Sequence, residues 1–204
     1  MGLTASSKRL IISTGVENGL AWPYRELKRE IPEVYSQCER ISEICERCNG
    51  LEAVIGETRK EQDRVLKIRS NIYLALKRKT ADILDVAVPP ANMGKLMDSI
   101  DKIAEQFSTT IPMFGHAGDG NLHPHLMKDL VEKGKENLRA AKREVYRETA
   151  KLGGVITAEH SLGRIRIPDL DICLDKKELE LMRDIKKVFD PNGILNPGCA
   201  IKPE

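Results

Sequence analysis

The sequence predicts an α+β fold in which a compact open sheet carries helices on one face. Helical and strand-like segments alternate along the chain, and the spacings between them are too short for a barrel. Hydrophobic residues make up 41% and charged residues 31% of the 204 residues, as in ordinary globular proteins. Because only 4% of the residues are aromatic, the core must be mainly aliphatic. One domain is the default for a chain of this length.

Five helices are expected, because apolar residues recur at helical spacing and turn residues follow them. The clearest stripe contains Leu96, Ile100, Ile103 and Phe107. The expected helices span about 31–48, 59–79, 93–107, 129–152 and 176–188.

Four short apolar runs bounded by glycine or proline are expected to be strands. Pro89 and Pro90 end one of them, and the pair Gly153-Gly154 precedes another. The expected strands span 52–56, 83–88, 110–114 and 155–158, whereas residues 1–30 form a poorly defined N-terminal segment.

Charge and hydropathy limit the classes of partner. The 33 basic and 31 acidic residues give a net charge of +2, too balanced to predict nucleic-acid binding. The run Lys77-Arg78-Lys79 is interpreted as a solvated helix end rather than a phosphate-binding patch. No apolar stretch approaches the roughly 20 residues that span a bilayer, and the start lacks the features of a signal peptide. We expect a cytoplasmic protein without a transmembrane segment, peripheral to a membrane only through partners.

The five cysteines are an odd number and lack the dense, even framework of a small secreted protein, so reduced thiols are expected. Cys45 and Cys48 form a lone C-x-x-C on the face of a predicted helix. One interpretation is a pair of buried small side chains, and the other is a metal or redox pair.

The stretch Gly115 to His125 (GHAGDGNLHPH) contains three of the four histidines of the chain within a glycine-rich frame. Glycine allows positive φ and a close approach of the backbone to a ligand. The spacing of His116 and His123 suits two imidazoles that converge across a loop on a divalent metal.

The fourth histidine follows a glutamate in Gly153 to His160 (GGVITAEH). Neighbouring side chains of an extended segment point in opposite directions, so Glu159 could face a metal while His160 faces a substrate. Two imidazoles and one carboxylate leave open coordination positions at which a metal can polarise a substrate.

Less specific interpretations of the same residues remain open. The four histidines could be satisfied turn or capping residues, and His125 could lie outside the site. Asp119 and Asn121 are either hydrogen-bond partners of ligand histidines or turn formers.

Taken in order, these segments resemble the C-terminal domain of FAD-linked oxidases of the vanillyl-alcohol oxidase superfamily, particularly glycolate oxidase flavin subunits, D-lactate dehydrogenases and D-2-hydroxyglutarate dehydrogenases. The resemblance covers about residues 31–204 and implies a ferredoxin-like antiparallel sheet covered by helices. Four features carry it: Lys67-Ile68-Arg69 on a helix, Asp85-Val86-Ala87-Val88-Pro89, the pair GHAGDGNLHPH and GGVITAEHSLG, and the closing FDPNGILNPG.

The resemblance also implies the roles of individual residues. His116, His123 and Glu159 would bind a divalent metal, zinc first and manganese or iron as alternatives. His160 would take the hydroxyl proton of the substrate. Arg69 would bind the substrate carboxylate, and Asn196 would lie near the flavin edge. Taken alone, Arg69 could instead be a solvated helix arginine and Asn196 a turn residue.

Three departures from the family pattern matter. Ser161 stands where the family usually places glycine after the Glu-His pair, so the loop is expected to be less free. Ile83 replaces a lysine that binds the second carboxylate of 2-hydroxyglutarate, which disfavours that substrate. No segment upstream of residue 31 could be the N-terminal FAD-binding domain, so we expect an excised piece, a subunit whose flavin domain is another polypeptide, or a relic.

The resulting hypothesis is that the chain is the substrate-side domain of a flavin-dependent 2-hydroxy-acid dehydrogenase of glycolate or D-lactate type. We expect it to be inactive without a flavin-binding domain or subunit. An electron-transfer subunit is a further expected partner. One alternative is a non-catalytic metal-binding assembly subunit of a flavoprotein complex. Another is a flavin-independent metallohydrolase with a His-His-Glu site.

Overall fold

The computed structural model describes residues 31–47, 58–199 and 201. The chain divides into two compact units, Met1–Lys77 and Arg78–Glu204, and each is described by itself. The segment at 1–30, the strand expected at 52–56, the position of Cys48 and the side chain of Cys45 lie outside the described residues.

The described part of the first unit contains two helices, α1 (Ile31–Arg47) and α2 (Arg59–Lys77). Both were predicted, and α2 begins at a capping box. The backbone N–H of Thr58 donates to Glu61 Oε2 over 2.9 Å, and the N–H of Glu61 donates to Thr58 Oγ1 over 3.3 Å. At its other end, Lys77, Arg78 and Lys79 are exposed, as expected for a solvated helix end.

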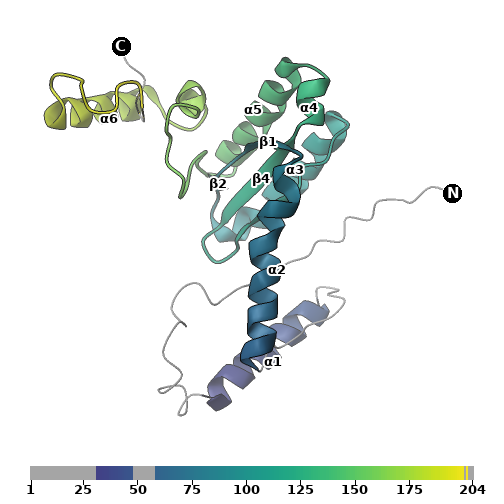
Figure 1. Cartoon of the computed structure of the whole chain (residues 1–204). Coiled ribbons are helices and arrows are strands. Elements are labelled where there is room, and N and C mark those ends of the chain that lie inside the picture. The colour runs from purple at the N-terminus through teal and green to yellow at the C-terminus, as the bar shows by residue number, and fades with distance from the viewer. Residues whose placement is uncertain (1–30, 48–57, 200, 202–204) are drawn as a thin grey trace. The chain divides into compact units, whose positions relative to one another are not determined.

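The second unit is built around a central antiparallel strand, β4 (Asn121–Met127) (Figure 1). Two short strands, β1 (Thr80–Ile83) and β2 (Val86–Ala87), follow each other along one edge of β4. On the other edge, β3 (Met113–His116) pairs with β4 through a register that opposes Phe114 to His123.

The order of these segments confirms the expected ferredoxin-like arrangement. An isolated antiparallel bridge joins Ala87 to Val155, so the segment after the last sheet helix lies outside β2. Across the sheet, the order is the bridge at Val155, then β1 and β2 on one line, then β4, then β3. Along the chain, the order is strand, helix, two strands, helix, strand.

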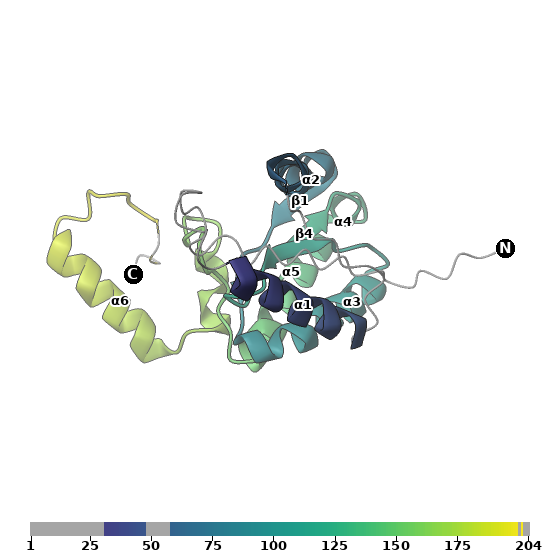
Figure 2. The ribbon, with the colours of Figure 1, turned by 90° about the horizontal axis from the view of Figure 1, so that it is seen from below.

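Helices α3 (Met93–Gln106) and α5 (Lys135–Lys151) pack side by side, and the short α4 (Asp129–Glu132) contacts α5 (Figure 2). Their apolar sides and one side of the sheet form the core, which is aliphatic apart from Tyr146, as the composition predicted. Fully burying one such leucine or isoleucine contributes about 1.5–3 kcal/mol. The main core residues are Leu84, Val86, Leu96, Ile100, Leu122, Leu126, Ala141 and Val145.

The structure differs from the expected elements in four places. Residues 121–127, expected to be loop, form the central strand, and all of them are buried. The helix expected at 129–152 is divided by Gly134, whose φ of 127° no helix accommodates. Of the strand expected at 155–158 only the bridge at Val155 forms, and the strand expected at 83–88 is interrupted at Leu84 and Asp85.

A 3₁₀ segment, η2 (Pro90–Asn92), precedes α3, and the C-terminal part of this unit contains a second one, η3 (Ile167–Ile172), and the helix α6 (Lys176–Phe189). Asp175 and Glu178 form a capping box at the start of α6. None of the helices in the described part of the chain has the length and apolarity that crossing a bilayer requires.

Candidate metal centre

Three separate segments bring the histidines together. His116 ends β3, His123 lies on the neighbouring strand β4, and His160 follows Glu159 in the turn after Val155. Because Phe114 opposes His123, His116 lies one pleat further along β3 on the same side of the sheet. The two imidazoles therefore converge across paired strands. The spacing alone had suggested that they converge across a loop.

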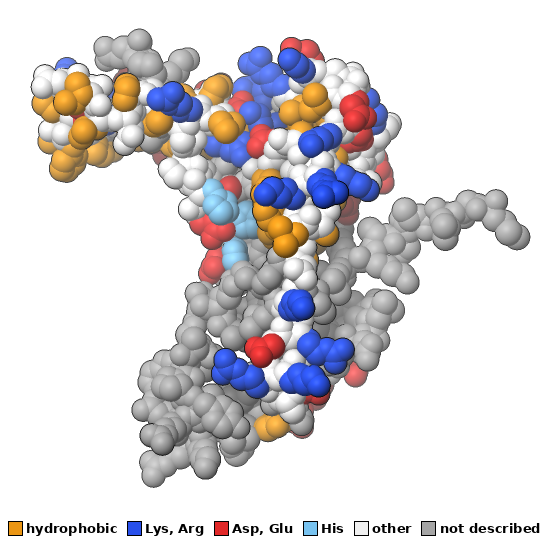
Figure 3. All heavy atoms as spheres, in the orientation of Figure 1, with side chains coloured by type: hydrophobic (Ala, Val, Ile, Leu, Met, Phe, Trp, Pro, Cys, Tyr) orange, Lys and Arg blue, Asp and Glu red, His pale blue; other side chains and the backbone are white. Residues whose placement is uncertain are grey.

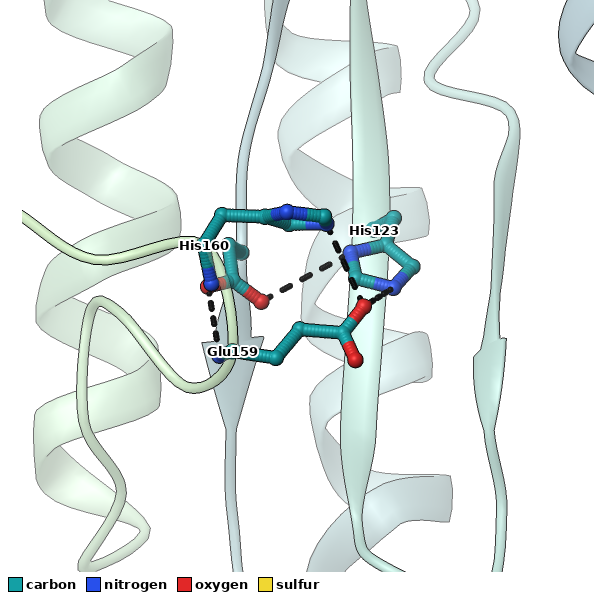
Figure 4. A group of neighbouring side chains, drawn as sticks. His123, Glu159 and His160 are labelled. Carbon is teal, nitrogen blue, oxygen red and sulfur yellow. Dashed lines mark hydrogen bonds and ion pairs between the residues drawn. The ribbon is translucent and has the colours of Figure 1, made fainter. Parts of the chain in front are cut away.

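The carboxylate of Glu159 is the centre of this arrangement. Its Oε1 lies 3.0 Å from Nε2 of His123, 3.2 Å from Nε2 of His160 and 3.5 Å from Nε2 of His116. Figure 4 shows Glu159 reaching across to the imidazoles of His123 and His160. Three ring nitrogens from three segments thus face one carboxylate oxygen, the donor chemistry that zinc and related divalent metals bind.

The four side chains of the site differ in their exposure to solvent, from the buried His123 to the exposed His160. The exposed fraction is 5% for His123, 25% for His116, 46% for Glu159 and 64% for His160. Histidine and acidic side chains accordingly lie together at the surface in Figure 3. The site is therefore buried at His123 and exposed to solvent at His160.

The pair Glu159-His160 does not have the geometry that the sequence suggested. An extended segment would point the two side chains apart, but the chain bends here and the two side chains lie 3.2 Å apart. Ser161 follows with a φ of 64°, the left-handed region that glycine favours. Ser161 therefore occupies a backbone conformation that glycine adopts at lower cost.

Asp85 is a residue of this site to which the sequence assigned no role. It lies in the interruption between β1 and β2, is only 3% exposed, and belongs with His123, Glu159 and His160 to a group of potential ligand atoms within 4.8 Å of one another. Its Oδ2 accepts hydrogen bonds from the backbone N–H groups of Ala158, Glu159 and His160. The only hint in the sequence is a charged residue inside the apolar run Ile83 to Val88, which would need partners if it were buried.

Burial and hydrogen bonding act in opposite directions on Asp85. Burial alone would raise the pKa of its carboxyl, but hydrogen bonds from the His160 N–H, the Asn121 amide and the neighbouring N–H groups hold the pKa below its usual value. For His123, burial lowers the pKa of the imidazole despite the nearby carboxylates of Glu159 and Asp85. Burial thus favours the neutral form of the His123 imidazole, the form that binds a metal.

The flanking residues of the motif have structural contacts. Asn121 donates to Asp85 Oδ1 over 2.9 Å and to the carbonyl of Val86 over 3.1 Å, so it contacts an acid and not a ligand histidine. His125 is fully buried outside the group of potential ligands; its Nδ1 lies 3.0 Å from Thr80 Oγ1 and its ring packs on Phe114. Asp119 is an exposed turn residue, one of the two roles expected for it.

Two of the three glycines in the motif serve backbone packing. A Cβ on Gly115 would lie 2.1 Å from the carbonyl oxygen of Asn121, and one on Gly120, at a φ of 73°, would lie 1.9 Å from the carbonyl oxygen of Val88. Only Gly118 has open space around it. The glycine-rich frame thus allows β3, β4 and the chain after β2 to approach closely, which brings the histidine-bearing strands together.

Comparison with known proteins identifies the family. The sequence model of FAD linked oxidases, C-terminal domain, matches residues 26–200. The chain belongs to this family. The FAD-linked oxidase domain thus covers both units of the structure, in agreement with the resemblance drawn from the motifs.

Named relatives of this FAD-linked oxidase domain are longer proteins. It is 31% identical over 205 residues to D-lactate dehydrogenase of Archaeoglobus fulgidus, a match that covers 99% of this chain and 46% of the relative. It is 32% identical over 201 residues to the glycolate oxidase subunit GlcD of Bacillus subtilis, covering 97% and 40%. D-2-hydroxyglutarate dehydrogenase of Stutzerimonas stutzeri is 31% identical over 153 residues, covering 72% and 33%. The chain spans less than half the length of these relatives.

Two residues with expected roles are not among the described interactions of the site. Arg69 lies on α2 in the other unit, and its side chain is outside the described residues. Asn196 is exposed in the turn after α6 with a φ of 48°, and its carbonyl accepts a hydrogen bond from the N–H of Cys199 over 3.0 Å. Both assignments remain predictions.

Proposed function

We propose that this chain is the substrate-side domain of a flavin-dependent 2-hydroxy-acid dehydrogenase of glycolate or D-lactate type. The observation that carries the proposal is the convergence of three imidazole Nε2 atoms on Oε1 of Glu159 within 3.0–3.5 Å. In this class of reaction, a 2-hydroxy acid loses its hydroxyl proton to a base and a hydride from the carbon that bears the hydroxyl, and it becomes a 2-oxo acid. FAD when bound supplies the hydride acceptor.

The residues at the site suit a divalent metal. His116 and His123 come from paired strands, which hold their imidazoles rigidly, and Glu159 adds one carboxylate. His123 Nδ1 is buried without a hydrogen bond among the described residues, and it faces the Asp85 carboxylate at 3.6 Å while Nε2 faces Glu159. We assign His116, His123 and Glu159 as the metal ligands. A bound zinc, or manganese or iron in its place, would supply Lewis-acid polarisation of the substrate hydroxyl and carboxylate.

His160 is the base of the proposed reaction. It is the most exposed of the three imidazoles, at 64%, so it faces the side from which a substrate arrives. A neutral imidazole can take the hydroxyl proton at its Nε2 atom, and Glu159 at 3.2 Å stabilises the imidazolium that results. The buried His123 is positioned for ligation and not for contact with substrate.

The substrate class is a small 2-hydroxy monocarboxylate. A planar guanidinium binds a carboxylate through two parallel hydrogen bonds, and we assign this role to Arg69. Ile83 offers no charge for a second carboxylate, which favours glycolate or D-lactate over 2-hydroxyglutarate. The names of two relatives, D-lactate dehydrogenase and the glycolate oxidase subunit, agree with this class of substrate, whereas D-2-hydroxyglutarate dehydrogenase acts by name on a dicarboxylate.

The flavin-bearing partner is a domain or subunit outside this chain. The relatives contain more than twice the length matched here, as the 46% and 40% coverage implies. One side of α6 carries Leu181, Ile185, Val188 and Phe189 at helical spacing, all more than half exposed. An apolar stripe of this size is typical of a surface that further protein covers. Asn196, which follows α6, is assigned to the flavin edge, and an electron-transfer subunit would take the electrons onward.

Calorimetric titration of the zinc-loaded chain with small acids tests this proposal. We expect glycolate and D-lactate to bind only when zinc is present, and acetate, which lacks the hydroxyl group, to bind more weakly. His160→Ala should retain zinc and weaken the binding of both hydroxy acids. Binding that is independent of zinc, or hydrolysis of a simple ester by the zinc-loaded chain without flavin, would contradict the proposal.

A further inference from the structure

We propose that Asp85 is the positioning residue of this site, which orients Glu159, His160 and His123 without binding metal or substrate. The proposal rests on the proposed function for the identity of the reacting groups. Its support is the pattern of hydrogen bonds around one buried carboxylate, and the residue is only 3% exposed.

One oxygen of Asp85 holds the turn that carries Glu159 and His160. Oδ2 accepts the backbone N–H groups of Ala158 over 2.8 Å, Glu159 over 2.9 Å and His160 over 2.8 Å. Successive N–H groups that converge on one anion form a concave backbone nest. This curvature replaces the extended conformation that would point the two side chains apart. The bend therefore sends the Glu159 carboxylate and the His160 imidazole to the same place.

The other oxygen of Asp85 faces the central strand. Oδ1 accepts the side-chain amide of Asn121 over 2.9 Å and lies 3.6 Å from Nδ1 of His123. At 3.6 Å this contact is electrostatic and longer than a hydrogen bond, and a carboxylate that faces one ring nitrogen favours leaving the other nitrogen for a metal. Here the other nitrogen, Nε2, is the atom that faces Glu159 at 3.0 Å. Asp85 thus connects the turn to β4 through the interruption between β1 and β2.

The hydrogen bonds also explain why Asp85 positions the site and does not ligate a metal. It lies near enough to His123, Glu159 and His160 to count as a potential ligand. However, Oδ2 already accepts three N–H groups, and Oδ1 accepts the Asn121 amide. A metal would have to compete with these bonds, whereas Glu159 Oε1 faces only the imidazoles in the described contacts.

Asp85→Asn in the full chain tests this proposal through two measurements. The first is amide hydrogen exchange of Ala158, Glu159 and His160 in the metal-free chain, and the second is the zinc affinity of the folded chain. We expect faster exchange at these three amides, because a neutral amide oxygen accepts N–H groups more weakly than a carboxylate. Zinc affinity should fall about 10-fold to 100-fold, as when other outer partners of metal ligands are removed.

Asp169→Asn is the matched control. Asp169 is 2% exposed and pairs with Lys142 and Arg143, so its replacement also disturbs a buried carboxylate, but one outside the site. It should destabilise the fold while leaving both exchange at the three amides and zinc affinity unchanged. If Asp85→Asn does not fold, Asp85→Glu keeps the charge, displaces it by one methylene and should give the same two changes to a smaller extent.

The outcomes separate this proposal from the proposed function. Faster exchange with unchanged zinc affinity would reduce Asp85 to a structural role and overturn the proposal, and so would unchanged exchange. If the parent chain binds no zinc, the metal assignment fails, and the exchange of the three amides still decides whether Asp85 positions the turn.

Discussion

Nε2 of His123 and Oε1 of Glu159 lie 3.0 Å apart, although one residue is buried in the central strand and the other stands in an exposed turn. The carboxylate thus enters the closed end of the site while its backbone stays at the surface. Two further imidazoles approach the same oxygen from β3 and from the turn itself. A site of this kind needs the sheet, the turn and the Asp85 contacts to form together.

The two histidines of β4 should behave differently on substitution. His123→Ala should lower zinc affinity more than about 100-fold, because it removes a ligand. His125→Asn should retain zinc affinity and destabilise the fold by about 1–3 kcal/mol, because it disturbs a fully buried ring with a partner at Thr80. Zinc titration and urea unfolding of both variants check this assignment, and equal loss of zinc in the two would contradict it.

Two glycines of the motif GHAGDGNLHPH, Gly115 in β3 and Gly118 in the turn after it, provide a packing test. Gly115→Ala should destabilise the fold by about 3 kcal/mol, since the new methyl group would overlap the backbone of β4. Gly118→Ala should change stability by less than about 0.5 kcal/mol, because nothing lies within 4 Å of its Cβ position. Chemical denaturation of the two variants gives the comparison. Similar stabilities would mean that β3 and β4 are not packed as described.

Ser161→Gly should stabilise the chain by up to about 1 kcal/mol. A serine in the left-handed region costs roughly 1–2 kcal/mol, and the greater freedom of glycine in the unfolded chain offsets part of the gain. The φ of 64° at Ser161 is the observation behind this expectation. Urea unfolding of Ser161→Gly and of the exposed control Ser161→Ala measures the effect. A glycine variant less stable than the alanine variant would exclude a left-handed residue here.

Cys173 should react slowly with thiol reagents. Burial raises the pKa of its thiol to about 11, so at pH 8 the thiolate fraction is about 100-fold below that of a thiol with the ordinary value. Because the folded pKa is raised, this thiol favours the folded state less as the pH rises from the unfolded value toward 11. Peptide mapping after iodoacetamide treatment at pH 8, with the urea-unfolded chain as control, measures the rate. Equal rates in both states would refute the burial.

The fold was largely predictable because each helix has a clear apolar stripe, as on α3 with Leu96, Ile100 and Ile103. The central strand β4 was not predicted. Pro124 lacks a backbone N–H, and polar residues at 121, 123 and 125 look like loop residues, yet all are buried. Their burial depends on contacts with distant segments, which local patterns do not encode.

His116, His123, Glu159 and His160 could be picked out as candidate site residues, because residues of the right chemistry are concentrated in two motifs. The role of Asp85 could not be predicted in the same way. Its partners, the N–H groups of residues 158–160, become neighbours only after the chain folds. The orientation of the His160 side chain likewise depends on a bend of the backbone that the residues of the turn do not encode by themselves.

Elemental analysis of the purified chain tests whether His116 and Glu159 bind a metal that His160 does not. The parent is compared with His116→Ala, Glu159→Ala and His160→Ala. We expect close to one divalent metal per chain in the parent and in His160→Ala, and little in the other two variants. No metal in the parent, or equal loss in His160→Ala and His116→Ala, would contradict the assigned roles.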